Sequence, residues 1–185
     1  VLQPAQDLWD KARRAGELDS LADKGHLAEL LRGFNNRAVF LHGPGGSGKT
    51  YCMTEVVMKV LQQVFGRDAV KAIAAANSAA RLLGGKTMHA ASKMTRNQSL
   101  KAKKLKPNSR ARKALDDEWS NVLLLLGNDM GQASPELLAG CSRRASYGRR
   151  DFLNLDLRGV LEQPFGLVPL IVLMGDFMQL NPVAS

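Results

Sequence analysis

Gly43-Pro-Gly-Gly-Ser-Gly-Lys49-Thr50 has the residue types and the spacing that bind the phosphates of a nucleotide. The segment matches the pattern G-x-x-x-x-G-K-[ST] at each fixed position. Glycines let backbone N–H groups turn toward phosphate oxygens, while Lys49 is expected to reach the β- and γ-phosphates and Thr50 to offer its hydroxyl to Mg²⁺. The pattern therefore predicts a nucleoside triphosphate site. Its cofactor-binding residues are Gly43, Pro44, Gly45, Gly46, Ser47, Gly48, Lys49 and Thr50.

The segments on either side of this phosphate loop have the patterns of a strand and a helix. Residues 37–42 form a short, mostly apolar run that is typical of a buried parallel strand. Residues 49–65 place apolar side chains at helical spacing, namely Met53, Val56, Val57, Val60, Leu61 and Val64. Strand, loop and helix thus follow in the required order, with the positive helix N-terminus facing the anion.

Further apolar runs alternate with helical segments along the chain. The expected strands are residues 70–75, 121–126 and 169–174, and the expected helices are residues 18–31, a short one from 76, and one that begins at Ser134-Pro135-Glu136. This alternation predicts an α/β domain, in which a mainly parallel sheet carries helices on both faces and binds ligands at the carboxyl ends of its strands. We expect residues 1–34 to be a helical lead-in and residues 35–185 to be this domain, with a basic surface excursion at about 95–115.

The composition bounds the partners and the compartment. The chain has 185 residues, a formal net charge of +9 and a pI of about 9.9, which favour nucleic acid as an anionic partner, ahead of an anionic membrane surface. Cys52 and Cys141 have neither metal-ligand spacing nor a disulfide pattern, which favours a reducing, intracellular compartment: nucleus or mitochondrion in a eukaryote, cytoplasm in a bacterium. No apolar run reaches the roughly 18 residues of a membrane span. Because the sequence starts at Val1 and stops at Ser185 just after a strand pattern, we expect a fragment of a longer protein.

Three segments together resemble the superfamily 1B DNA helicases of the petite-integration-frequency and RecD-like group. The first is the phosphate loop. The second runs from Ala75-Ala-Asn-Ser-Ala-Ala80 to Gly84-Gly-Lys-Thr-Met-His89 and is similar to motif Ia of that family and the Gly-x-Thr-x-His element after it. The third, Gly175-Asp-Phe-Met-Gln-Leu-Asn-Pro-Val183, resembles motif III and is much more specific than the phosphate loop.

This resemblance implies the RecA-like motor domain of a P-loop NTPase, which binds and hydrolyses ATP with Mg²⁺ and moves on single-stranded DNA, 5′ to 3′, in DNA repair and recombination. It implies that Asp176 and Gln179 contact the nucleotide, with Gln179 sensing the γ-phosphate. It also implies that Asn77, Ser78 and His89 contact DNA. The alternatives are a solvated loop at Asp176 and Gln179, and a partly buried, hydrogen-bonded ring at His89.

The chain departs from the family after the third strand, where these helicases carry Asp-Glu. Alignment on Ser134-Pro-Glu-Leu-Leu138 places Asn128 at the Asp position and Asp129 at the Glu position, whereas alignment from the strand end places Leu126 and Gly127 there. Asn128 is isosteric with Asp but neutral, so the affinity for Mg²⁺ should fall. Asp129 is one methylene shorter than Glu, which makes it a compromised base.

The resemblance and this alignment together assign the site. Lys49, Asp129 and Gln179 are the candidate catalytic residues, and Thr50, Asn128 and Asp129 are the candidate metal ligands. A glutamine-centred adenine motif is not found before the first strand, so the preference for ATP depends on the resemblance alone. The arginine finger belongs to a second RecA-like domain, which we expect in the full-length protein and which this sequence lacks.

Three functions stay open at this point. The first is a helicase motor domain; the second is a nucleotide-dependent DNA-binding module with impaired hydrolysis; the third is an unrelated P-loop kinase or ATPase. Two runs of basic residues either contact a nucleic-acid backbone or form a solvated surface. The first run consists of Lys101, Lys103, Lys104, Lys106, Arg110, Arg112 and Lys113, and the second consists of Arg143, Arg144, Arg149 and Arg150. The first run contains no aromatic residue that could stack on bases.

Overall fold

A computed structural model describes residues 36–95, 105–106, 109–153, 163–176 and 178. The helix expected at residues 18–31 lies outside the described residues, as do Gln179 and most of the basic excursion. None of the helices in the described ranges combines the length and the apolar character that crossing a membrane requires.

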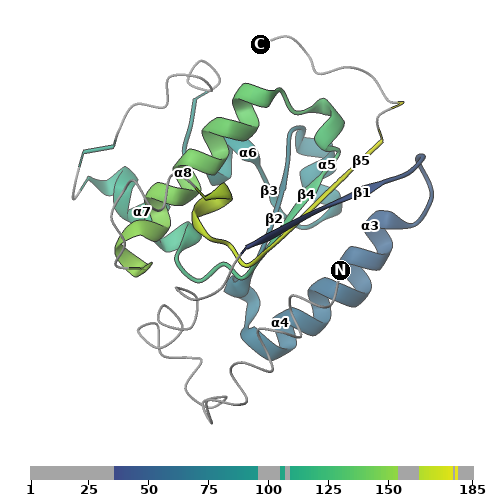
Figure 1. Cartoon of the computed structure of the whole chain (residues 1–185), viewed down its shortest axis with the longest axis horizontal. Coiled ribbons are helices and arrows are strands. Elements are labelled where there is room, and N and C mark those ends of the chain that lie inside the picture. The colour runs from purple at the N-terminus through teal and green to yellow at the C-terminus, as the bar shows by residue number, and fades with distance from the viewer. Residues whose placement is uncertain (1–35, 96–104, 107–108, 154–162, 177, 179–185) are drawn as a thin grey trace.

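A parallel sheet forms the centre of the described part of the chain (Figure 1). Its five strands have the order β1-β5-β4-β2-β3, and neighbouring strands pair in parallel. They are β1 (Arg37–His42), β2 (Val70–Ala74), β3 (Lys86–Thr87), β4 (Leu124–Asn128) and β5 (Leu170–Gly175). The predicted parallel sheet is therefore confirmed, although β3 was missed because two residues carry no periodic pattern.

Helices cover both faces of the sheet (Figure 1). The helix after the phosphate loop packs Met53 and Val57 against apolar side chains of β4 and β5, and it consists of α3 (Lys49–Tyr51), a π-helical segment (Cys52–Met58) and α4 (Lys59–Phe65). The short helix α5 (Asn77–Leu82) follows β2. The opposite face carries α6 (Met88–Ala91), α7 (Arg110–Trp119) and α8 (Pro135–Leu153), whose side chains pack on Ile73, Leu125 and Ile171.

Two strands differ from the sequence-based expectation. β1 was expected to be buried, but it lies at one end of the strand order and Phe40 is 39% exposed. Periodicity identified the strand, yet it carries no information about which strands flank it. The third strand was expected at residues 121–126, whereas β4 begins at Leu124, because the N–H of Leu123 donates to the carbonyl oxygen of Ala69 and fixes the register Val70↔Leu124.

The start of α8 forms as its sequence predicts. Ser134 Oγ accepts a hydrogen bond from the backbone N–H of Leu137 at 3.2 Å, and Pro135 occupies the first helical position. Leu137 is buried in the core. In the phosphate-loop helix, by contrast, Val56 and Val60 are about half exposed and do not line the inner face as expected.

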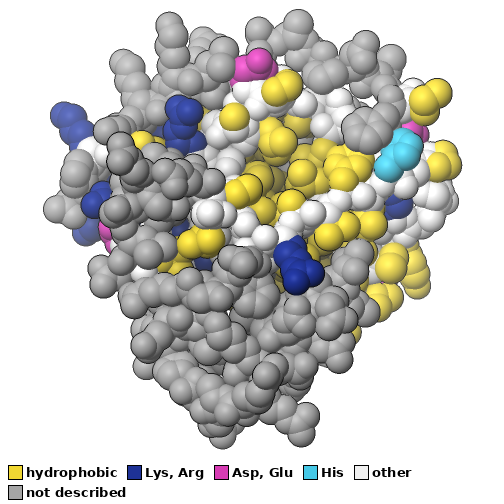
Figure 2. Space-filling model, in the orientation of Figure 1, with side chains coloured by type: hydrophobic (Ala, Val, Ile, Leu, Met, Phe, Trp, Pro, Cys, Tyr) yellow, Lys and Arg dark blue, Asp and Glu magenta, His cyan; other side chains and the backbone are white. Residues whose placement is uncertain are grey.

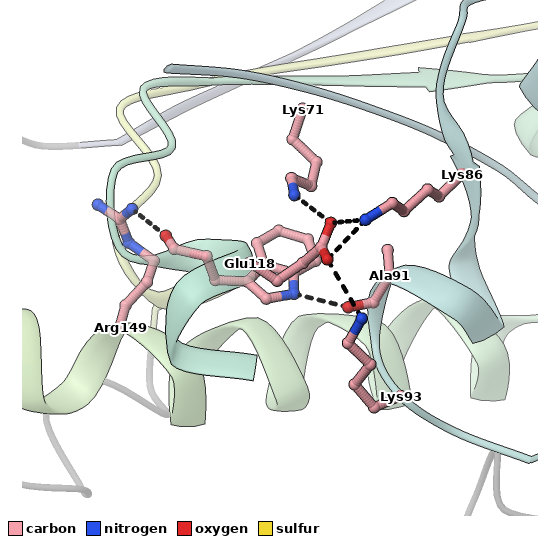
Figure 3. Close-up of polar contacts among 7 residues, drawn as sticks. Lys71, Lys86, Ala91, Lys93, Glu118 and Arg149 are labelled. Carbon is pink, nitrogen blue, oxygen red and sulfur yellow. Dashed lines mark hydrogen bonds and ion pairs between the residues drawn. The ribbon is translucent and has the colours of Figure 1, made fainter. Parts of the chain in front are cut away.

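Buried polar contacts fasten α7 to its neighbours (Figure 3). Arg149 of α8 is fully buried, and its guanidinium donates to the carbonyl oxygens of Gly166, Trp119, Ser120 and Val122 at 2.7–3.0 Å. Two of these carbonyls belong to the C-terminal end of α7, where the helix dipole favours a cation. Burial lowers the pKa of Arg149 to about 9, so it stays protonated at neutral pH. Arg149 therefore does not belong to a surface track for nucleic acid.

Glu118 of α7 binds lysine side chains from three other segments (Figure 3). Its carboxylate accepts hydrogen bonds from Lys71 of β2, from Lys86 of β3 and from Lys93, which follows α6. Burial alone would raise the pKa of Glu118, but the hydrogen bonds from Lys71 and Lys86 outweigh burial and lower it to about 2. This carboxylate therefore ties the β3 end of the sheet to α7.

Candidate nucleotide-binding site

The phosphate loop connects β1 to α3 and has the backbone that its glycines allow. Gly46 and Gly48 have φ angles of 76° and 79°, in the left-handed region where a side chain would be strained. Lys49 Nζ donates to the carbonyl oxygens of Gly43 at 2.6 Å and Pro44 at 2.8 Å, and to Ser47 Oγ at 3.1 Å. The ammonium group is therefore held by the phosphate loop itself, next to the segment where the phosphates are expected.

Asn128 lies beside the phosphate loop. It is the last residue of β4 and is 4% exposed, and its Oδ1 lies 3.4 Å from the hydroxyl of Thr50, which donates to it. The alignment from the strand end places Leu126 at the Asp position. Leu126 is fully buried in the apolar core with Met53 and Val57, so that alignment brings no polar group to Thr50. Of the two alignments, the geometry favours the one that places Asn128 at the Asp position.

Asp129 follows in an unusual conformation. Its φ and ψ angles of 51° and 45° are left-handed, which Asp tolerates better than most residues. It precedes a 3₁₀ turn, Met130–Gln132, and its carbonyl oxygen accepts the N–H of Gln132 at 3.0 Å. Its carboxylate is partly exposed at the edge of the site.

The loop after β4 lies against the end of β5. A Cβ atom added to Gly131 would come within 3.1 Å of the carbonyl oxygen of Asp176, so the two backbones approach closely. Asp176 Oδ1 accepts the N–H of Met178 at 2.9 Å, which caps the turn at the end of β5. Asp176 and Asp129 therefore lie at the same end of the sheet, and Gln179 falls outside the described residues.

The candidate DNA-binding residues lie at the carboxyl ends of β2 and β3. Asn77 and Ser78 are exposed in the first turn of α5, and His89 is partly exposed in α6, whose N-terminus Thr87 caps by accepting the N–H of Ala90 at 3.2 Å. In the sheet, Ala74 pairs with both Asn128 and Thr87. Those candidate nucleotide and DNA residues that the structure describes thus lie along one edge of the sheet, as parallel strands require.

The shared edge, the phosphate loop and the polar ends of β4 and β5 are the features expected of a RecA-like motor domain. A sequence profile described as PIF1-like helicase matches residues 28–185. The chain belongs to the PIF1-like helicase family.

Two named relatives support membership of the PIF1-like helicase family. The ATP-dependent DNA helicase PIF1 of Saccharomyces cerevisiae (strain YJM789) is 32% identical over 151 residues, which cover 82% of this chain and 16% of that protein. The ATP-dependent DNA helicase PIF6 of Trypanosoma brucei brucei (strain 927/4 GUTat10.1) is 31% identical over 152 residues, which cover 80% of this chain and 17% of that protein. The chain therefore spans less than a fifth of the length of these PIF1-like helicases.

A solved structure shows the same fold. The Pif1 helicase from Bacteroides in complex with ADP-AlF3 and ssDNA matches with a TM-score of 0.56 at 24% identity, over 88% of this chain and 33% of that one. The described sheet and its helices are thus an α/β, RecA-like P-loop domain, as the sequence resemblance implied.

Proposed function

We propose that this chain is the N-terminal, nucleotide-binding motor domain of a DNA helicase, in which a neutral residue at the metal position weakens ATP hydrolysis. The observation that carries the proposal is the contact between Thr50 and Asn128. It places two uncharged oxygens side by side, 3.4 Å apart, next to the phosphate loop. Oxygen donors of this kind suit Mg²⁺, although a carboxylate would hold it more strongly.

In this proposal each side chain has a defined part. Lys49 leaves its loop contacts and donates to the β- and γ-phosphates of ATP, while Thr50 and Asn128 orient Mg²⁺, which when bound neutralises charge on those phosphates. Asp129 is the base that orients the attacking water, and its short side chain lowers its efficiency. Asp176, which follows β5, contacts the nucleotide, and Gln179 senses the γ-phosphate.

Nucleic acid is the proposed partner along the same edge. Asn77, Ser78 and His89 contact the backbone of single-stranded DNA, and the formal net charge of +9 favours that polyanion. The relatives named above are ATP-dependent DNA helicases, and the matching Bacteroides structure is a complex with ssDNA. We therefore extend the proposal to translocation 5′ to 3′, in DNA repair and recombination within a reducing intracellular compartment. A second RecA-like domain supplies the arginine finger.

Asn128 also favours a second candidate function, a DNA-binding module that binds nucleotide without turnover. An amide in place of a carboxylate removes one negative charge beside the cation, so binding can persist while hydrolysis is lost. Membership of the PIF1-like helicase family argues against the third possibility, an unrelated P-loop kinase.

Steady-state ATP hydrolysis with Mg²⁺, measured with and without an oligo-dT strand, tests the proposal. The motor domain is supported by slow hydrolysis that the strand stimulates and that Lys49→Ala abolishes. Nucleotide binding without turnover supports the second candidate instead. An absence of nucleotide binding in the folded wild-type chain contradicts both.

A further inference from the structure

The loop after β4 and the turn after β5 pack against each other at two glycines. β4 and β5 pair as far as Gly127↔Leu173, and beyond that point Gly131 lies against the backbone of Asp176. A Cβ atom added to Gly131 would lie 3.1 Å from the carbonyl oxygen of Asp176, and one added to Gly175 would lie 3.2 Å from the backbone nitrogen of Gly131. Both distances are shorter than ordinary van der Waals contact, so the two segments pack backbone on backbone.

Lack of space, and not backbone conformation, favours glycine at position 131. The φ angle of Gly131 is outside the left-handed region that Gly46 and Gly48 occupy, so a residue with a side chain could adopt this backbone. Its side chain would meet a main-chain carbonyl oxygen, which cannot turn aside as the end of a flexible side chain can. A larger residue should therefore push the loop away from the turn.

The same loop holds Asp129 in a conformation that few residues with a side chain adopt. Its φ and ψ angles are 51° and 45°, and such a conformation persists where neighbouring contacts fix it. Within the loop, the carbonyl oxygen of Asp129 accepts the N–H of Gln132 at 3.0 Å, and Met130 is buried in the apolar core. The third contact is that of Gly131 with Asp176. The turn after β5 therefore helps to position the candidate base.

Asp176 joins this contact to the rest of the turn. Its carbonyl oxygen faces Gly131, while its carboxylate accepts the N–H of Met178 at 2.9 Å. Closely packed backbone transmits a displacement, whereas a contact between long, exposed side chains absorbs it. A shift of the loop after β4 should therefore reach Met178.

We propose that Gly131 is a positioning residue, because its missing side chain lets the loop that carries Asp129 and the turn that carries Asp176 move as one unit when nucleotide binds. This inference rests on the proposed function, since it needs a nucleotide in the phosphate loop. The nucleotide acts on the loop beside Asn128, and the contact at Gly131 transmits the change to Met178. A side chain at position 131 uncouples the two segments without removing a group that touches the nucleotide.

Backbone amide NMR of the full chain, titrated with the non-hydrolysable ATP analogue AMP-PNP and Mg²⁺, tests this coupling. In the wild type we expect the resonances of Gly46, Gly48 and Met178 to shift. Gly131→Val should reduce the shift at Met178 by about twofold or more, and should leave the phosphate-loop shifts and the affinity for the analogue unchanged.

Gly66→Ala is the control for a general loss of stability. Gly66 has a φ angle of 87° at the end of α4, so alanine strains the backbone there, but a Cβ atom would meet nothing within 4 Å. This variant should keep the full shift at Met178. If Gly131→Val does not fold, Gly131→Ala adds a single methyl group at the same point and should reduce the shift at Met178 to a smaller extent.

The proposal is overturned if the folded variant at position 131 shows the wild-type shift at Met178, or if Gly66→Ala reduces that shift equally. It is also overturned if Gly46 and Gly48 shift in the wild type while Met178 does not, a result that leaves the nucleotide site intact. Unchanged resonances at Gly46 and Gly48 in the wild type would contradict the proposed function itself, and this inference with it.

Discussion

At the scale of single residues, the proposed metal position depends on the contact between Thr50 and Asn128. A carboxylate there would add a full negative charge beside the cation, and in a partly enclosed site charge interactions at such distances amount to several kcal/mol. Asn128 offers only the dipole of its carbonyl. The same residue is nearly isosteric with Asp, so a substitution tests the charge with little change in packing.

Asn128→Asp combined with Asp129→Glu should increase Mg²⁺-dependent ATP turnover by at least about tenfold, because the first restores the charge and the second restores the reach of the base. Single-turnover hydrolysis measures this directly. Gln62→Glu on α4 is the control, since it adds a negative charge away from the site and should leave turnover unchanged. Unchanged turnover in a folded double variant would count against the assignment of both residues.

Several site residues could be predicted from the sequence, because their chemistry depends on local spacing. The phosphate loop needs only its own glycines and Lys49, and the structure brings them together as expected. Alignment on Ser134-Pro-Glu-Leu-Leu138 placed Asn128 in the candidate site, and the structure puts its side chain beside Thr50. The burial of Arg144 was not predicted at all, since a run of arginines has the same composition on a surface as at a helix contact.

At the scale of elements, the Glu118 cluster holds β2, β3 and α6 against α7. One carboxylate accepts from three ammonium groups, of which that of Lys71 is the most buried, so its removal leaves these cations without their shared counter-charge. Breaking one side of a buried ionic contact costs more than an exposed pair contributes. The packing of β2, β3 and α6 against α7 therefore depends on Glu118 more than on any one lysine.

Glu118→Gln should lower the free energy of unfolding at pH 7 by roughly 1–3 kcal/mol, measured by urea denaturation. Because the folded-state pKa of Glu118 is depressed from 4.5 to about 2, its stabilisation is full above pH 4.5 and is lost as the pH falls toward 2. The difference between wild type and Glu118→Gln should therefore shrink across that window. Glu55→Gln, which breaks an exposed pair with Lys59, should cost less than about 0.5 kcal/mol. Equal effects of the two variants would contradict the role of Glu118.

Element types were largely predictable, whereas their environments were not. Apolar runs and the cap at Ser134 located β1, β2, β5 and the start of α8 within a residue or two. Burial of β1 was predicted wrongly because its place in the sheet order depends on the whole topology. The start of β4 was wrong because the bond from Leu123 to Ala69 is a contact between distant segments.

At the scale of the whole molecule, the sheet brings to one edge the candidate nucleotide and DNA residues within the described ranges. Figure 2 shows one face of the molecule, on which apolar side chains are visible and the described Lys and Arg side chains are scattered around them. The positive charge of the chain is thus not gathered into one stripe on the described part of this face. Specific contacts at Ser78 and His89, rather than charge alone, are expected to position a strand.

Ser78→Ala with His89→Ala should weaken binding to oligo-dT by about tenfold, because two backbone contacts are lost, and should leave nucleotide affinity unchanged. Fluorescence anisotropy at several salt concentrations measures the affinity. Arg67→Ala removes a full charge at the amino end of β2, and it should change the affinity less than the double variant does. A larger loss in Arg67→Ala would place the strand elsewhere.

The most direct test of the central claim is the dependence of ATP affinity on Mg²⁺, measured by titration calorimetry for wild type and Asn128→Asp with either Mg²⁺ or EDTA present. If Asn128 occupies the metal position beside Thr50, Mg²⁺ should strengthen ATP binding by Asn128→Asp at least about tenfold more than it strengthens binding by wild type. Equal Mg²⁺ dependence in the two folded proteins would contradict the claim.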